Sequence, residues 1–329
     1  MTTNGAFDSI LGQRSAVETL VHALRSGRVH HAYRFEGPEG VGKEMAAFAL
    51  VQALLCDHSR ALGCGDCSAC RRAVKISDED PRVPQHPDVL IVGRGVYPPS
   101  VLGTQSRETA AIGVEQIRRV ILSRIGFPPH EGRALVIIVR AAHELSQQAA
   151  NALLKTLEEP PDKVHFVLIT SQPNRLLDTI RSRTLAVRFA PLPESVLGAI
   201  LERLGKPAAV SRLAGGSASV ALSLVDDDRA RARAEFVRGA DEAIGAPGID
   251  AALAFAGSRP DDRDALLEQL RALAQHYALG ARDLVSEQPR VADVLAARHA
   301  IVASAMEAVE RNAQPALVLE SMVVRLRAI

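Results

Sequence analysis

The sequence predicts an α/β protein whose first part contains a parallel sheet and whose last part is all helical. Short apolar, β-rich runs alternate with helical patterns from Asp8 to Phe189, as expected for a buried parallel sheet whose strands are joined by helices. A glycine-rich loop follows the first of these runs. After the acidic residues Asp226, Asp227 and Asp228, no run typical of a strand is left.

The first part of the chain supplies the strand candidates, which are Ala32–Glu36, Val89–Val92, Ala134–Val139, His165–Thr170 and Leu185–Phe189. Between the second and the third, Gly93–Ala111 contains Gly, Pro and Ser without periodicity, so we expect a mobile loop there. Ser146 is the expected N-cap of a helix in which apolar residues recur at helical spacing, and Pro160 ends that helix.

The later part of the chain is separated from the sheet by a proline-flanked joint, Ala190–Ser195. A short helical piece follows to about Val225, and residues 229–329 have the pattern of amphipathic helices. We therefore predict domains at 1–189, 190–228 and 229–329. Breaks between the last helices are expected at Gly245–Gly248, Ser258–Asp262, Glu287–Pro289 and Asn312–Pro315.

Composition excludes several classes of protein. The 329 residues are 47% hydrophobic, enough for two or three domains. Lys and Arg number 39 and Asp and Glu 38, a net charge of +1 that gives no overall attraction to nucleic acid or membrane. Met1–Gln13 has no signal-peptide pattern, and no apolar run is long enough to cross a bilayer. We expect a cytoplasmic protein with no membrane partner.

The glycine-rich stretch Gly37–Glu44, GPEGVGKE, matches a phosphate-binding loop in all but its last position. A strand precedes it and a helix follows, so its backbone N–H groups and the helix N-terminus would face phosphates. The candidate cofactor-binding residues are Gly37, Gly40, Gly42 and Lys43.

The residues that should hold Mg²⁺ for ATP hydrolysis are missing. Glu44 stands where a Ser or Thr hydroxyl is expected, and the strand Leu135–Val139 is followed by Arg140 and Ala141 where acids are expected. We therefore predict a vestigial loop in a chain that does not hydrolyse ATP by itself. Whether a nucleotide or another anion occupies the loop is left open. An active site would have to recruit His143 or Glu144 instead.

All four cysteines lie in one short segment, as Cys56, Cys64, Cys67 and Cys70. Four thiolates at this spacing in a cytoplasmic protein suit a tetrahedral Zn²⁺ ion, and they leave no position for a catalytic water. We expect structural zinc. An iron–sulfur cluster is the chemical alternative, and four reduced, buried thiols are the simplest one. His58 and His86 are spare ligands that such a site does not need.

These segments together resemble the clamp-loader branch of the AAA+ proteins, and most of all its delta-prime type in bacterial DNA polymerase III. The resemblance rests on Ile10–Gln13, His30–Lys43, Cys56–Cys70, Ala149–Pro161 and Leu176–Thr184. It implies a RecA-like AAA+ domain with an inserted zinc module, a small helical lid and a C-terminal helical collar. It also implies a non-hydrolysing stator, which assembles with gamma/tau and delta subunits to load the sliding clamp on primed DNA.

The resemblance assigns a role to Arg183. The family pattern Ser-Arg-Cys carries an arginine finger, and here it appears as Ser182, Arg183 and Thr184. A guanidinium can hold two phosphate oxygens at once, so Arg183 is expected to complete the ATP site of a neighbouring gamma/tau subunit. An ordinary surface arginine in a salt bridge is the alternative. Ser219 stands where the lid of related proteins carries a second arginine.

Two other functions compete with this prediction. One is a gamma/tau-like, ATP-hydrolysing subunit that uses an unusual metal site. The other is a freestanding zinc-containing protein that binds DNA, which the near-neutral charge and the lack of a basic, aromatic surface oppose.

Overall fold

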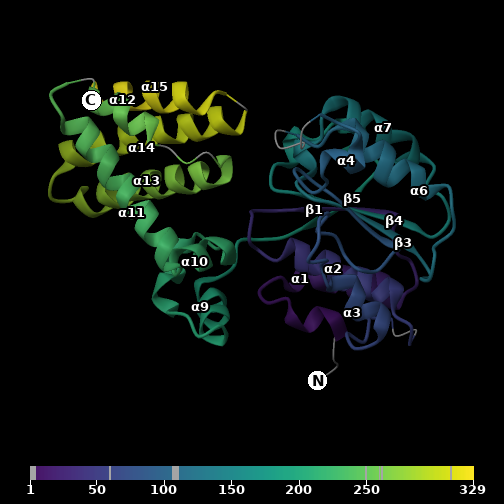
Figure 1. The fold of residues 1–329 in the computed structure, drawn as a ribbon. Helices are drawn as coiled ribbons and strands as arrows, with labels where there is room; N and C mark the ends of the chain where they lie inside the picture. The colour runs from purple at the N-terminus through teal and green to yellow at the C-terminus, as the bar shows by residue number, and fades with distance from the viewer. Residues whose placement is uncertain are drawn as a thin grey trace. The chain divides into compact units, whose positions relative to one another are not determined.

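The computed structural model describes residues 5–58, 61–105, 111–248, 250–258, 260, 262–311 and 313–329. The chain divides into two compact units, Met1–Leu222 and Ser223–Ile329. The described part of the first unit contains a sheet covered by helices, and the described part of the second contains helices without strands (Figure 1). None of the helices described is both long and apolar enough to cross a membrane.

The sheet of the first unit has five parallel strands in the order β2-β3-β4-β1-β5. The strands are β1 (Ala32–Glu36), β2 (Val89–Val92), β3 (Leu135–Val139), β4 (Val164–Thr170) and β5 (Leu185–Arg188). The predicted α/β class is therefore confirmed, and each strand lies within one residue of its predicted bounds. The segments that follow β1, β3 and β4 meet at the same edge of the sheet, because the strands are parallel.

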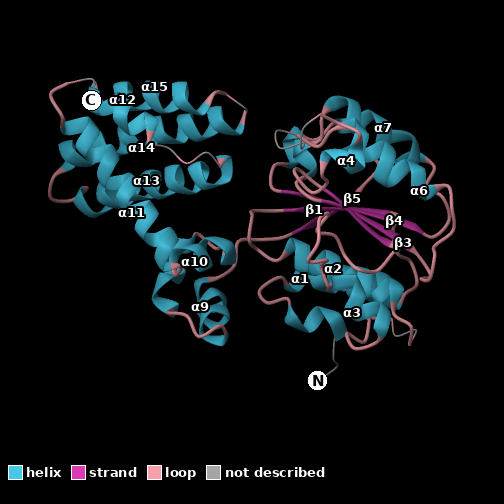
Figure 2. Ribbon diagram, viewed as in Figure 1, coloured by secondary structure: helices cyan, strands magenta, loops and turns pink. Residues whose placement is uncertain are grey.

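Helices cover both faces of this sheet (Figure 2). On one face lie α1 (Arg14–Arg25), α2 (Lys43–Leu55) and α3 (Ser68–Val74), after the short η1 (Gly5–Ser9). The other face is covered by α4 (Pro99–Leu102), by a continuous helical segment made of α5 (Val114–Gln116), η2 (Ile117–Leu122) and α6 (Ser123–Ile125), and by α7 (Gln147–Glu158). Every residue of β3 is buried between these layers.

Helix α7 begins and ends where the sequence predicts. The Ser146 hydroxyl accepts a hydrogen bond from Ala149 N at 3.2 Å, which is the N-cap contact. Leu153 and Leu157 are among the residues that it buries against the sheet. The helix stops before Pro160, so Glu158 lies in its last turn. Three short helices join the remaining strands: η3 (Ala142–Glu144), η4 (Pro173–Arg175) and α8 (Asp178–Arg181).

The segment expected to be a mobile loop, Gly93–Ala111, holds helix α4. Leu102 is fully buried, and the hydroxyl of the buried Tyr97 donates to Ile91 O at 2.9 Å. Residues 106–110 of this segment lie outside the described residues. The part that is described is therefore anchored in the core by apolar contacts that its lack of periodicity did not reveal.

The predicted lid range, 190–228, contains α9 (Glu194–Arg203), η5 (Ala208–Ala214) and α10 (Ala218–Leu224). The second unit is made of α11 (Asp227–Gly245), α12 (Asp250–Gly257), α13 (Arg263–Leu284), α14 (Pro289–Glu310) and α15 (Pro315–Arg327). These helices stop and start at or near the four predicted breaks. The three-domain division of the chain stays a prediction, since the contact-based boundary lies between Leu222 and Ser223.

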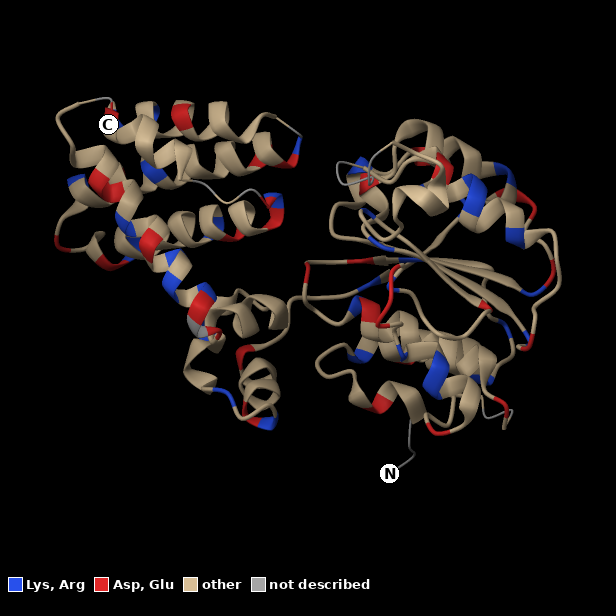
Figure 3. Cartoon of the chain, in the orientation of Figure 1, with Lys and Arg blue, Asp and Glu red and all other residues tan. Residues whose placement is uncertain are grey.

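The second unit has its own apolar core. Leu270 and Leu273 of α13, Val302 of α14 and Leu319 and Val323 of α15 are fully buried in it. Acidic and basic residues are interspersed along the ribbons of its described helices (Figure 3). Mixed charge of this kind is typical of solvent-exposed helices.

Candidate functional site

The phosphate loop lies between β1 and α2, in the local setting that the sequence predicts. Gly37, Gly40 and Gly42 have φ angles of 146°, 70° and 99°, a region that residues with a side chain rarely adopt. A Cβ atom at Gly37 would lie 2.2 Å from Phe189 O, and one at Gly40 would lie 2.2 Å from the Ser219 hydroxyl. Packing of the loop therefore requires Gly37 and Gly40, and the backbone angle favours glycine at position 42, whether or not a nucleotide binds.

Lys43 is turned toward the loop's own backbone. Its Nζ donates to Gly37 O at 2.6 Å and also to Pro38 O, and the residue is only 6% exposed. Burial lowers the pKa of Lys43 to about 8, against the opposing charge of Glu39. A nucleotide would have to displace these carbonyl contacts before Lys43 could bind its phosphates.

The two positions at which the sequence predicts missing metal-binding residues are joined to each other. Arg140 Nε donates to Glu44 Oε1 at 2.9 Å, and Arg140 Nη2 donates to the same oxygen. Arg140 continues the sheet beyond β3, with its N–H bonded to Val92 O at 2.9 Å, and Glu44 lies in the first turn of α2. Sequence reasoning treated them as separate defects. Their opposite charges were the signal that they form one ion pair.

Neither suggested replacement for the missing acid is free. His143 Nδ1 lies 3.1 Å from the Thr170 hydroxyl. Burial, followed by the charges of Arg175, Lys43 and Arg94, lowers the pKa of His143 to about 4, so its ring is neutral at pH 7. Glu144 forms an ion pair with Arg94, with 3.4 Å between Nε and Oε2. Recruiting Glu144 for a metal would require its ion pair with Arg94 to break.

The segment that leads into α10 packs directly on the phosphate loop. Ala218 N donates to Gly40 O at 2.9 Å, and the hydroxyls of Ser217 and Ser219 lie 3.0 Å apart. Ser219, at the position where the family pattern has a second arginine, contributes a small hydroxyl at this contact. The loop is thereby covered by the chain's own backbone and serine side chains.

Arg183 lies in the turn between α8 and β5, and the buried Arg34 of β1 fastens this turn. Arg34 Nη1 donates to Arg181 O at 2.8 Å and to Thr184 Oγ1 at 2.6 Å, and Thr184 Oγ1 donates to Ile180 O at 2.8 Å. Sequence reasoning missed Arg34 and gave Thr184 no role. The signal was a charged residue inside an otherwise apolar strand, where burial requires polar partners.

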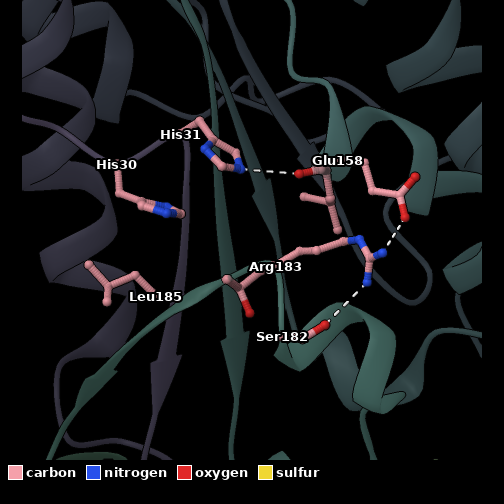
Figure 4. Close-up of a pocket in the computed structure, with 8 residues that line it drawn as sticks. His30, His31, Glu158, Ser182, Arg183 and Leu185 are labelled. Carbon is pink, nitrogen blue, oxygen red and sulfur yellow. Dashed lines mark hydrogen bonds and ion pairs between the residues drawn. The ribbon is translucent and has the colours of Figure 1, made fainter.

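The Arg183 side chain contacts its own chain through both terminal nitrogens (Figure 4). Nη2 forms an ion pair with Glu158, and Nη1 donates to Thr179 O at 2.9 Å and to Ser182 Oγ at 3.2 Å. The salt bridge of the simpler interpretation is thus present. Arg183 also lines an open pocket of about 620 Å³ together with His30, His31, Leu157, Glu158, Ser182, Thr184 and Leu185.

The four cysteines form a cluster at the start of α3. Their sulfur atoms all lie within 4.8 Å of one another, and the Sγ atoms of Cys64 and Cys70 are 3.9 Å apart. A tetrahedral site with zinc–sulfur bonds of about 2.3 Å would separate its sulfurs by about 3.8 Å. The donor set and its spacing therefore fit a four-coordinate metal ion.

The backbone around the cluster stabilises the thiolate of Cys64, which is more exposed than the other three cysteines. N–H groups of Cys67 and Asp66 lower the pKa of Cys64 to about 6, while burial raises the pKa of Cys70. Cys67 is the N-cap of α3, with its sulfur accepting from Cys70 N at 3.4 Å. His86, proposed as a spare ligand, accepts instead from Asp88 N at 3.1 Å and is no member of the cluster.

The five-stranded parallel sheet, the phosphate loop between β1 and α2 and the helical segment packed on that loop define an AAA+ type of α/β protein. Residues 12–193 match the family model described as DNA polymerase III, delta subunit. This match spans more than half of the chain. The chain therefore belongs to the DNA polymerase III delta subunit family of AAA+ clamp-loader proteins.

Curated relatives include both kinds of subunit. DNA polymerase III subunit gamma/tau of Mycobacterium tuberculosis H37Rv is 32% identical over 232 residues, which cover 67% of this chain and 36% of the relative. Subunit delta' of Escherichia coli K12 is 33% identical over 226 residues, or 67% and 62% of the two chains. Subunit delta' of Bacillus subtilis 168 is 31% identical over 230 residues, or 69% and 63%. The chain thus spans less than two thirds of each relative's length.

Proposed function

We propose that the chain is a delta-prime-like subunit of the DNA polymerase III clamp loader that does not hydrolyse ATP itself. In this role it assembles with gamma/tau and delta subunits, and the complex places the sliding clamp on primed DNA. Arg183 completes the ATP site of an adjoining gamma/tau subunit, and the cysteine cluster holds a structural zinc ion. The observation that carries the proposal is the ion pair between Glu44 and Arg140.

The charge at the place of the catalytic metal supports this proposal. Mg²⁺ bound with ATP takes a hydroxyl from the phosphate loop and an acid from the end of the neighbouring strand. Here the loop position offers a carboxylate already neutralised by Arg140, so a divalent cation gains no net attraction from the pair. Lys43, bonded to Gly37 O and Pro38 O, adds a second contact that a nucleotide would have to break.

Calorimetry of the purified chain with Mg²⁺-ATP tests the first half of the proposal, with Lys43→Ala as the control. We expect no heat that depends on Lys43. Micromolar binding, about −8 kcal/mol, that disappears in Lys43→Ala would contradict a vestigial loop.

The second half is tested in a loader reconstituted with gamma/tau and delta subunits. Arg183→Ala is expected to lower the clamp-stimulated ATPase, because removing a trans-acting arginine removes charge stabilisation at the transferring phosphoryl group. Arg181→Ala, two residues earlier in the chain, is the matched control and should retain activity. Equal ATPase rates for wild type and Arg183→Ala would refute the role of Arg183.

A gamma/tau-like ATPase is the second candidate, and its support is the 32% identity to the gamma/tau subunit. It predicts Mg²⁺-dependent ATP turnover by the isolated chain that Lys43→Ala abolishes. The ion pair of Glu144 with Arg94 weighs against it, since that carboxylate would have to leave Arg94 to bind a metal.

A further inference from the structure

We propose that Glu158 is a positioning residue that holds Arg183 inward and competes with the phosphates of the neighbouring subunit's nucleotide for its guanidinium. This inference rests on the proposed function of Arg183. It assigns to Glu158 the role of an internal counter-anion, which an incoming polyphosphate must displace before Arg183 can act.

Three acceptors of this chain already occupy N–H groups of the Arg183 guanidinium. A guanidinium grips a phosphate most strongly with two N–H groups side by side. Both terminal nitrogens of Arg183 are already used within the chain, Nη2 by Glu158 and Nη1 by Thr179 O and Ser182 Oγ. A phosphate that binds Nη1 and Nη2 side by side therefore competes with Glu158 for Nη2.

The exposure of the pair makes this exchange feasible. The Arg183 and Glu158 side chains are 32% and 47% exposed, so water and salt screen their attraction. Ion pairs of this kind shift an equilibrium by about two- to fivefold. A polyphosphate carries several negative charges and offers several oxygens, so it outcompetes a single carboxylate without requiring a conformational change of the backbone.

Glu158 is held at a defined place beside the pocket. It lies in the last turn of α7, and His31 Nε2 lies 3.1 Å from the carbonyl of the preceding residue, Leu157 (Figure 4). A carbonyl can only accept, so Nε2 of His31 carries the proton. Burial and then the neighbouring His30 lower the pKa of His31, against the opposing effect of the Leu157 contact. The carboxylate is thus presented to Arg183 by a fixed helix end.

The experiment uses the reconstituted loader and compares Glu158→Gln with Glu159→Gln. Glu159 is also exposed, and its carboxylate has no ion pair with any residue that the structure describes. Because the carboxylate has to leave before the ground-state complex forms, its loss should strengthen nucleotide binding without changing the chemical step. We expect Glu158→Gln to lower the KM for ATP about two- to fivefold at unchanged kcat, with Glu159→Gln equal to wild type.

The Arg183→Ala background separates the two proposals. If Glu158 acts through Arg183, Glu158→Gln has no effect on KM in that background. A KM that is unchanged or raised by Glu158→Gln in the wild-type background, or lowered equally in both backgrounds, overturns the inference while Arg183 keeps its trans-acting role. If Arg183→Ala itself leaves the ATPase unchanged, the proposed function has failed and the inference fails with it.

Discussion

Asp88 offers the strongest test of how the sheet is held together at the start of β3. Its carboxylate is fully buried. It accepts N–H bonds from His130 at 2.6 Å, Glu131 at 2.8 Å and Gly132 at 2.7 Å, and a bond from Arg124 Nη2 at 2.9 Å. Asp88→Ala would leave three backbone donors and a largely buried guanidinium without their acceptor.

The expected loss follows from these four contacts. Removing one partner of a buried charged pair costs about 3–5 kcal/mol, because the other charge stays buried and unpaired. For a unit of this size, that corresponds to a fall in melting temperature of about 6–20 °C. The assay is thermal denaturation followed by circular dichroism at pH 7. Asp178→Ala is the control, since that side chain is 92% exposed and should change stability by less than about 0.5 kcal/mol.

The destabilisation caused by Asp88→Ala should also depend on pH. Burial by itself raises the pKa of Asp88, but the N–H bonds from Gly132, Glu131 and His130 outweigh it, so the net pKa is lowered. A carboxyl whose pKa is lower in the folded state stabilises the fold above its unfolded pKa of about 3.9, and loses this effect as the pH falls through the folded value. The difference between wild type and Asp88→Ala should therefore shrink below about pH 4. A destabilisation under about 1 kcal/mol at pH 7, or one that is constant from pH 7 to pH 3, would refute the reasoning.

The remaining predictions concern the candidate site. Metal analysis of the purified chain should give about one zinc ion per chain. Removal of the zinc by a chelator should lower the melting temperature. A metal content under about half an equivalent would contradict a zinc site. Arg34→Met should lower the free energy of unfolding by about 2–4 kcal/mol, because Thr184 and Glu36 lose a buried partner. Urea denaturation measures this change, and a decrease under about 0.5 kcal/mol would mean that Arg34 does not hold the turn in place. A double-mutant cycle of Glu44→Ala and Arg140→Ala should give a coupling energy of about 0.2–1 kcal/mol, since both side chains are partly exposed. Zero coupling would show that the pair does not form in solution.

The sequence alone predicts the sheet of the first unit closely. Apolar runs such as Leu135–Val139 are recognised as strands from neighbouring residues alone, because a strand buried on both faces forms a continuous apolar run. The helix starts at Pro289 and Pro315 can also be predicted from local sequence, because proline at the first helical position favours a helix start. The glycine loop and the cysteine spacing are likewise signals that lie within a few residues of each other.

The side-chain contacts of the site could not be predicted in this way. Glu44 and Arg140 are 96 positions apart in the chain, and Arg34 reaches a carbonyl 147 positions away. Such contacts depend on which strands become neighbours and on how far each side chain extends. The sequence predicts a mobile loop at Gly93–Ala111 for the same reason. Leu102 is buried by contacts with residues distant in the sequence, and a local pattern does not reveal such contacts.

The ion pair between Glu44 and Arg140 makes these two positions interdependent under mutation. A hydroxyl restored at position 44 alone leaves the Arg140 guanidinium as an uncompensated cation where a metal would bind. An acid restored at position 140 alone faces Glu44 with a second negative charge. Either single change therefore removes the charge balance within the pair. Substitutions at each of these positions are constrained by the residue at the other.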